Sequence, residues 1–241
     1  MPDSMIDDVF LDDVRHKGEP ILFTNQEIRK MLSLARVDKN DVFYDLGCGW
    51  GQNLVVALTE GKAAKVVGVE MEEDRQKVAL ARLEKWAAKR PKLKGRFEVV
   101  LGDFEKLLDD ELEGASLDEA TVVFYGLSGY KKLIHGIQKS WRGLPGPRRF
   151  VYYYRWLFPE IVASARDYPF LLSEFPFKRP RSELEWLSSV VGKAKSTIGA
   201  GGPTQEELWD ELTHDYDILG NVEEVAWYRR RLKAVLKAGC P

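Results

Sequence analysis

The stretch that most constrains the fold of this chain runs from Val42 to Gly51 and reads V-F-Y-D-L-G-C-G-W-G. Its β-branched and aromatic residues predict a short buried strand. The three alternating glycines predict a tight turn after that strand, where bare backbone approaches a ligand that side chains would block. A strand that leads into such a turn indicates a ligand-binding α/β fold.

Strands and helices alternate along the first two thirds of the chain. The expected strands are residues 42–46, 65–70, 97–101, 120–125 and 150–154. The expected helices are one that follows a cap at Asn25, then residues 52–60 and 73–89, and one that carries Tyr130 to Trp141. This alternation with short links predicts a doubly wound, mostly parallel sheet.

Beyond residue 155 the alternation ends. Residues 170–177 are expected to form a late strand or a hairpin arm at the sheet edge. Three later helices are expected to begin after Ser182, Thr204 and Asn221, because each is followed at the third position by Glu. The predicted organisation is therefore an acidic arm over residues 1–20, a ligand-binding domain over 21–178 and an α-helical C-terminal addition over 179–241.

Composition favours a soluble cytoplasmic protein with a real core. The hydrophobic fraction is 44%, seven residues are tryptophan, and the net charge of −2 argues against an obligate nucleic-acid coat protein. Two cysteines give no disulfide framework, and the three histidines have no ligand spacing, so no metal site is expected. The acidic N-terminus does not read as a signal peptide, and no apolar run is long enough to span a membrane.

An acid lies at or just past the carboxyl end of three expected strands: Asp45, Glu70 and Asp103. The dinucleotide fingerprint is G-x-G-x-x-G, and its helix N-terminus receives a pyrophosphate. This chain has G-x-G-x-G beside a carboxylate, which would repel a pyrophosphate and suits a ligand that carries an ammonium and a sulfonium. S-adenosylmethionine (SAM) is such a ligand. An adenine-dinucleotide enzyme remains an alternative, because Glu70 lies at the right distance from the glycines for a ribose acid.

Each acid has a distinct task if the ligand is SAM. Glu70 is expected to accept hydrogen bonds from both ribose hydroxyls. Asp103 is expected to accept one from the adenine amino group, while a backbone amide near Phe104 donates to the ring. Asp45 is expected to face the methionine ammonium, through the loop that contains Gly47 and Gly49 or through a water.

With these residues the chain resembles the class I, Rossmann-like SAM-dependent methyltransferases. The resemblance covers about residues 20–155 and rests on residues 45–51, 69–70 and 102–103. A finer resemblance, through residues 20–24 and 45–52, is to the non-SET protein-lysine methyltransferases, both archaeal broad-specificity and disruptor-of-telomeric-silencing type. It implies that Thr24 and Gln52 contact SAM. The long helical C-terminal part and Trp50 depart from the short archaeal enzymes.

The end of the fourth expected strand bears on the methyl acceptor. Enzymes that methylate exocyclic base amines typically carry [Asn/Asp/Ser]-Pro-Pro-[Tyr/Phe] there, whereas this chain has V-V-F-Y-G over residues 122–126. This disfavours methylation of adenine or cytosine. Tyr125 is the candidate catalytic residue. Alternatively, its ring only packs in the hydrophobic core at the end of the strand.

A lysine acceptor must lose its proton, because with a pKa of about 10.4 only about one amine in 2500 is neutral at pH 7. A poorly hydrated aromatic channel beside the sulfonium would favour that loss. Residues 150–156, with Phe175 and Phe177, are candidates for the channel or for ordinary core. Strand alternation allows only Tyr152 with Tyr154, or Tyr153, to line it.

Three functions are therefore expected, in this order. The first is a SAM-dependent methyltransferase of protein lysine amines. The second is a SAM-dependent methyltransferase of a small molecule or RNA, and the third is a non-catalytic SAM-binding regulator. Two basic runs, residues 85–96 and 229–237, are either solvated faces or phosphate-binding surfaces.

Overall fold

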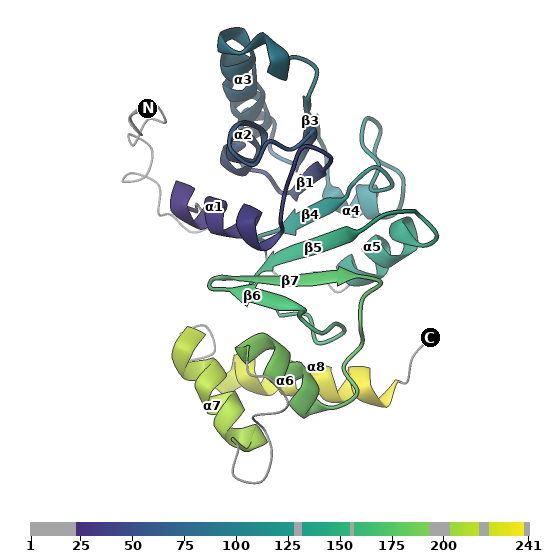
Figure 1. The fold of residues 1–241 in the computed structure, drawn as a ribbon. Helices are drawn as coiled ribbons and strands as arrows, with labels where there is room; N and C mark the ends of the chain where they lie inside the picture. The colour runs from purple at the N-terminus through teal and green to yellow at the C-terminus, as the bar shows by residue number, and fades with distance from the viewer. Residues whose placement is uncertain (1–22, 128–131, 155–156, 193–202, 217–221, 239–241) are drawn as a thin grey trace.

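The computed structural model describes residues 23–127, 132–154, 157–192, 203–216 and 222–238, which form a seven-stranded sheet with helices on both faces (Figure 1). The strands are β1 (Val42–Leu46), β2 (Lys65–Glu70), β3 (Phe97–Leu101), β4 (Val122–Tyr125), β5 (Arg148–Tyr153), β6 (Ala165–Asp167) and β7 (Phe170–Phe175). Their order across the sheet is β3-β2-β1-β4-β5-β7-β6. The first five strands are parallel, and β7 and β6 continue the sheet in antiparallel pairing. The predicted doubly wound, mostly parallel sheet is thus confirmed.

The winding direction reverses between β1 and β4. From β1 the chain first builds outward through β2 and β3, and it then returns to the other side of β1 for β4 and β5. Asp45 pairs with Gly68 on one side and with Phe124 on the other. In open α/β sheets the crevice at this switch point, at the carboxyl ends of the strands, is where ligands bind.

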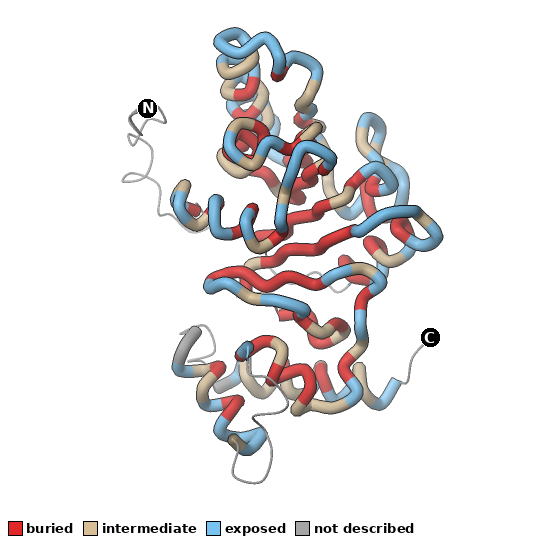
Figure 2. Tube along the Cα trace, viewed as in Figure 1, coloured by how far each residue is buried: buried red, intermediate tan, exposed pale blue. Residues whose placement is uncertain are grey.

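The helices cover the sheet as two layers. On one face lie α1 (Asn25–Leu34), α2 (Gln52–Thr59) and α3 (Glu73–Lys89), followed by a short 3-10 turn over Pro91–Leu93. On the other face lie α4 (Phe104–Leu108) and α5 (Leu133–Trp141). The last three helices, α6 (Glu183–Val191), α7 (Gln205–Tyr216) and α8 (Val222–Lys237), lie beyond β6 in Figure 1 and share the same buried cluster. The central strands between these layers are almost entirely buried (Figure 2).

Several predicted boundaries are confirmed and some are corrected. The bounds of β1, β2, α3 and β3 are those expected from the sequence. The prediction that Asn25 caps the first helix is wrong, because Thr24 caps it: its hydroxyl accepts from the Glu27 amide at 3.2 Å, and the Glu27 carboxylate accepts from the Thr24 amide at 2.8 Å. This reciprocal capping box satisfies two otherwise unpaired amides, which places Asn25 inside the first turn.

Strand β4 begins at Val122 rather than at residue 120, and β5 spans Arg148–Tyr153 rather than residues 150–154. Two elements had no sequence prediction. Helix α4 has only five residues, and β6 has three, so neither shows a clear periodicity. Strand β7 fulfils the expectation of a hairpin arm, because it pairs with β5 and with the edge strand β6.

The C-terminal helices begin where the sequence predicts. Ser182 accepts from the Glu185 amide, and Thr204 accepts from the Glu207 amide, both at 3.2 Å. The predicted cap Asn221, the helix residue Tyr130 and the acidic arm over residues 1–20 lie outside the described residues. The apolar side chains of α6, α7 and α8 belong to the same buried cluster as those of β4 and β5.

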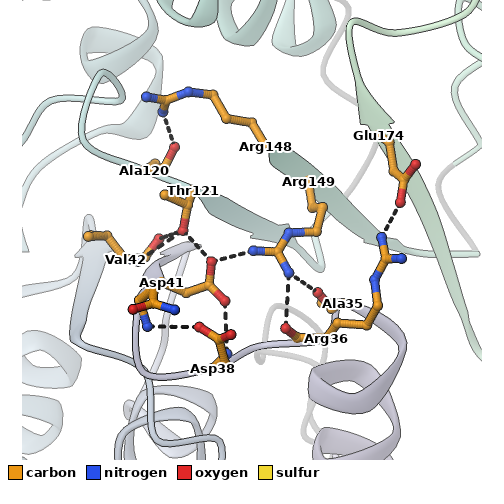
Figure 3. A network of polar contacts seen from close by, with 11 residues as sticks. Ala35, Arg36, Asp38, Asp41, Val42, Ala120, Thr121, Arg148, Arg149 and Glu174 are labelled. Carbon is orange, nitrogen blue, oxygen red and sulfur yellow. Dashed lines mark hydrogen bonds and ion pairs between the residues drawn. The ribbon is translucent and has the colours of Figure 1, made fainter. Parts of the chain in front are cut away.

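A buried ion pair ties together the amino ends of the parallel strands, which we call the amino edge of the sheet (Figure 3). The Arg149 guanidinium, on β5, forms a salt bridge with Asp41, the residue before β1, and donates to the Ala35 carbonyl at 2.6 Å. The other partner of Asp41 Oδ1 is the Thr121 hydroxyl, at 2.7 Å. This network links the end of α1 to β1, β4 and β5, at the opposite edge from the switch point.

Candidate functional site

The glycine loop follows β1 as the sequence predicts. The amides of Gly47 and Cys48 both donate to the Val69 carbonyl, at 2.9 and 3.0 Å, which holds the loop against the end of β2. Gly47 has a φ of +82°, and a Cβ atom there would lie 2.3 Å from Leu127 Cδ1. Glycine adopts this backbone conformation without strain, whereas a larger residue would be strained and would also displace the Leu127 side chain. Helix α2 begins directly after Gly51, so its free amides face the same edge of the sheet.

Glu70 is fixed against this loop. It is the last residue of β2 and is buried. One carboxylate oxygen accepts from the Gly49 amide at 2.8 Å, and the other accepts from the Glu72 amide at 3.0 Å. Hydrogen bonds from backbone amides stabilise the charged carboxylate, and they set its orientation without a cation.

Asp45 lies beneath the loop. Its side chain is 1% exposed, and its carboxylate accepts from the Asn53 amide nitrogen at 3.0 Å. Burial raises the pKa of Asp45 to about 7; the Asn53 hydrogen bond opposes this effect, and the negative charge of Glu70 adds to it. The carboxyl groups of Asp45 and Glu70 therefore interact in a water-poor site, where burial opposes the ionisation of Asp45.

Asp103 lies further along the same edge. It follows β3 and caps α4, because its carboxylate accepts from the Glu105 amide at 2.8 Å. The amide of Gly102 donates to the Glu70 carbonyl at 2.8 Å, which aligns the ends of β2 and β3. The half-buried ring of Phe104 packs edge-on against Tyr125, with 5.6 Å between centroids.

A pocket opens at the switch point beside the glycine loop. Its lining residues are Phe23, Asp45, Gly47, Cys48, Gly49, Trp50, Gln52, Asn53, Phe124, Gly126 and Leu127. Four predicted site residues are among them: Asp45, Gly47, Gly49 and Gln52. None of these lining residues, which all belong to the described chain, is Lys, Arg or His. The pocket is therefore suited to a cationic ligand rather than to a phosphate.

Five predicted site residues lie outside the lining of this pocket: Thr24, Glu70, Asp103, Phe104 and Tyr125. The Thr24 hydroxyl takes part in the capping box of α1, while its neighbour Phe23 lines the pocket. Tyr125 is 1% exposed and contacts Phe104 and Phe158 in the cluster beneath α4 and α5. The catalytic role of Tyr125 and the SAM contact of Thr24 stay predictions.

Several lining residues were not predicted as site residues from the sequence. Phe124 and Gly126 flank Tyr125, and strand alternation turns Phe124 toward the pocket face when Tyr125 faces the other core cluster. Asn53 follows Gln52 in the first turn of α2. Its hydrogen bond to Asp45 could not be predicted without knowing that Asp45 is buried. Phe23 carried a signal, because it adjoins Thr24 in the segment that carries the family resemblance.

Aromatic rings continue from the pocket toward the surface. The ring of Phe23 contacts those of Phe124, Tyr153 and Phe170, with centroids 5.7, 5.2 and 5.1 Å apart. Tyr153 in turn contacts Tyr154, contrary to the prediction from strand alternation that these two rings face opposite ways, because β5 ends at Tyr153. We call the rings of Phe23, Phe124, Tyr153, Tyr154, Tyr168 and Phe170 the aromatic wall. Tyr168, whose hydroxyl lies 2.8 Å from that of Tyr154, is its 48% exposed outer end.

The remaining predicted aromatic residues belong to the opposite core. Phe150 and Tyr152 stack on each other and contact Phe158. Phe175 and Phe177 contact Trp141 of α5. These four residues are therefore part of the ordinary core and do not line a channel. Trp156 lies outside the described residues. Of the predicted strand, Tyr153 is the side chain that contacts a pocket residue.

Within the part of the chain that the structure describes, His, Cys, Asp and Glu nowhere gather in a group of three that could hold a metal ion. Nor does any described helix have the length and apolar character required to cross a bilayer.

Comparison with known proteins identifies the fold. A crystal structure of an RNA methyltransferase from Salinibacter ruber, in complex with S-adenosyl-L-homocysteine, superposes with a TM-score of 0.51 at 23% identity, over 67% of this chain and 98% of that one. The fold of this chain is therefore that of the class I, Rossmann-like methyltransferases.

The sequence comparisons are more specific over a shorter stretch. Residues 22–126 match the model of the family described as "Histone methylation protein DOT1". A protein-lysine N-methyltransferase of Saccharolobus islandicus (strain REY15A) is 36% identical over 96 residues, which are 40% of this chain and 52% of that protein. The chain spans about half the length of this curated relative. It resembles the non-SET protein-lysine methyltransferases, and the resemblance falls on the elements that build the pocket.

Proposed function

We propose that this protein is a SAM-dependent methyltransferase. The observation that carries the proposal is the pocket at the switch point, where Asp45 and the amide-bound Glu70 adjoin a glycine loop and no lining residue is cationic. Such a donor and acceptor set fits a nucleoside that bears positive charge. Glu70 and Asp103 would hold the adenosine part, and Asp45 with the loop of Gly47 and Gly49 would hold the methionine part.

When bound, SAM supplies a methyl group on a positively charged sulfur. The work of the protein is then to hold donor and acceptor in line and to exclude water. Phe23, Phe124 and Leu127 are suited to the second task, because they place apolar surface around the pocket. Glu70 is suited to the first, since its two amide contacts fix it before any ligand arrives.

For the acceptor we propose a lysine amine of a protein. An amine with a pKa near 10.4 costs about 4.6 kcal/mol to deprotonate at pH 7, and poorly hydrated surroundings reduce that cost. The aromatic wall offers such surroundings from Tyr168 inward to Phe23. The names of the matching family and of the Saccharolobus relative support the same acceptor class. We place the reaction in the cytoplasm, consistent with the free thiol of Cys48.

Incubation with SAM carrying a labelled methyl group and a cell extract tests this function. Label in protein bands, with increments of about 14 Da on lysine in peptide mass spectra, is the expected result. Label in RNA or in small solutes would mean that the protein is a methyltransferase whose acceptor is not a protein lysine. If calorimetry shows SAM binding and no label is transferred, the protein is instead a non-catalytic SAM-binding regulator. Glu70→Ala is the control for background labelling.

Tyr125 can be tested separately. If its hydroxyl contacts the acceptor, Tyr125→Phe should lower the rate of transfer while the affinity for SAM stays the same. Unchanged transfer would assign Tyr125 to the core, where its ring already packs against Phe104 and Phe158. The Phe substitution keeps the ring, so it isolates the hydroxyl.

A further inference from the structure

A groove lies at the amino edge of the sheet, where β2 and β3 begin. It runs between the end of α2 and the turn that joins α3 to β3. Its lining residues are Leu58, Thr59, Lys62, Arg90, Pro91, Lys92, Leu93 and Arg96. The pocket described above lies at the carboxyl edge, so the length of β2, six residues or about 20 Å, separates the two. The groove is thus distinct from the methyl-transfer site.

The rim of the groove is positively charged. Lys62, Arg90 and Lys92 are exposed, and among the described residues none of them forms an ion pair. Arg96 is held by the Ala63 and Ala64 carbonyls, so its charge is fixed beside the groove. The nearest acid at the end of α2, Glu60, is already paired with Arg29 at 2.7 Å.

More cations lie in the same stretch of the chain. Lys85, Lys89 and Lys94 are exposed and likewise have no ion-pair partner among the described residues. A cation such as Lys89 in the last turn of α3 interacts favourably with the helix dipole. Lys62, Lys92 and Lys94 lie outside any α-helix, so that explanation does not apply to them. On a chain with a net charge of −2, this concentration of positive charge is local.

The floor of the groove is apolar. Leu58 and Leu93 form it from below, 2% and 7% exposed, and Pro91 is exposed at its side. A partner that fills the groove therefore has to offer apolar groups to the floor and negative charges to the rim. Covering the apolar floor would stabilise such a complex.

We propose that the groove binds an acidic peptide segment in which apolar side chains accompany aspartate or glutamate. A nucleic acid would satisfy the rim but would leave the floor uncovered. Sites for single-stranded nucleic acid add aromatic side chains on which bases stack, and the described lining contains none. The groove would thus dock a protein partner away from the site where methyl transfer is proposed.

The direct test uses the full chain and a fluorescent probe peptide, E-D-V-F-L-D-E-V, in an anisotropy titration. Saturable binding is expected for the wild type. Lys62→Glu with Lys92→Glu should weaken it at least tenfold. The matched control, Lys233→Glu with Lys237→Glu on exposed positions of α8, makes the same charge change and should stay within twofold of the wild type. Equal binding by both double variants would overturn the proposal.

Two further measurements separate the peptide from other occupants. A probe in which serine replaces the valine, phenylalanine and leucine keeps every charge and should bind at least tenfold more weakly. If it binds as well as the parent, the surface recognises charge alone and the proposal is wrong. It is also wrong if a DNA duplex displaces the probe and binds more tightly through Lys62 and Lys92. Calorimetry with SAM should give the same affinity for all variants, so failure here leaves the methyltransferase proposal intact.

Discussion

At the scale of single residues, the site depends on Glu70. Its carboxylate connects the ends of β1 and β2 through the amides of Gly49 and Glu72, and it also faces the edge where a nucleoside would bind. A side chain whose orientation is set by the backbone loses little entropy when a ligand arrives. That is why this residue is more informative to change than the exposed acids around it.

We predict that Glu70→Ala weakens SAM binding about tenfold to a hundredfold. The reason is that a charged hydrogen bond contributes roughly 1.5–3 kcal/mol, and every 1.4 kcal/mol is a factor of ten. Isothermal titration calorimetry measures the affinity, and Glu72→Ala, at an exposed neighbouring position, is the control. Unchanged affinity in Glu70→Ala would contradict the placement of the ribose beside β2.

The raised pKa of Asp45 predicts that the stability of the protein depends on pH. Its pKa is about 7 when folded, against an ordinary value of 3.8, so between about pH 4 and 7 the folded state binds more protons than the unfolded state. The free energy of unfolding therefore falls as pH rises through this window, by on the order of 4 kcal/mol from this group, and levels off above pH 7.

The check is a comparison with Asp45→Asn by urea unfolding at pH 5, 6 and 7. The substitution removes the titrating group, so stability of the wild type relative to the variant should decline steadily across this range. A constant difference would mean that Asp45 is already ionised at pH 5 in the folded protein. Asn53→Ala adds a directional test, because loss of its hydrogen bond should raise the pKa of Asp45 further.

The residues of the loop could be predicted because their chemistry is local. Gly47, Gly49 and Glu70 follow from a strand, a glycine spacing and an acid, all readable along the chain. Asn53, Phe124 and Leu127 could not, because each reaches the pocket through burial and alternation that depend on the packed sheet. Thr24 was predicted as a SAM contact and Asn25 as the helix cap, whereas Thr24 is the cap and its side chain lies outside the pocket lining.

At the scale of elements, the parallel strands were predictable and the antiparallel edge was less so. β1 and β2 are mostly apolar runs that are buried on both faces, and β3 has the same β-branched character at the exposed edge of the sheet. β6 has three residues and its exposed positions alternate with a half-buried one, which gives too short a pattern to identify. β6 pairs with β7 as a tight hairpin, in which Asp167 lies opposite Phe170, and β7 in turn occupies the edge that β5 leaves open.

The buried pair of Arg149 and Asp41 holds these elements at the amino edge, as Figure 3 shows. We predict that Arg149→Ala lowers the free energy of unfolding by roughly 3–5 kcal/mol, because it leaves the Asp41 charge buried without its cation. Arg29→Ala removes an exposed pair with Glu60 and should cost about 0–1 kcal/mol. Urea unfolding at pH 7 measures both, and similar losses in the two variants would contradict the prediction.

At the scale of the whole molecule, the helical C-terminal addition shares a core with the sheet. The buried side chains of α6, α7 and α8 join those of β4, β5 and α5 in one cluster. The Trp186 indole donates to the Phe158 carbonyl at 3.3 Å, and Arg231 of α8 forms a salt bridge with Glu160. Caps at Ser182 and Thr204 predicted where the helices begin, but no local pattern predicted that they pack onto the sheet.

A continuous core predicts that the protein unfolds in one cooperative transition. Trp186→Ala should therefore destabilise the whole chain by about 3–5 kcal/mol, because it removes a fully buried ring, and should lower the melting temperature by roughly 6–20 °C. Trp227→Ala, at a 38% exposed position on α8, is the matched control and should have a much smaller effect. Circular dichroism and tryptophan fluorescence should report the same midpoint in each variant. Two separate midpoints, with the sheet unaffected by Trp186→Ala, would show instead that residues 179–241 fold as a domain of their own.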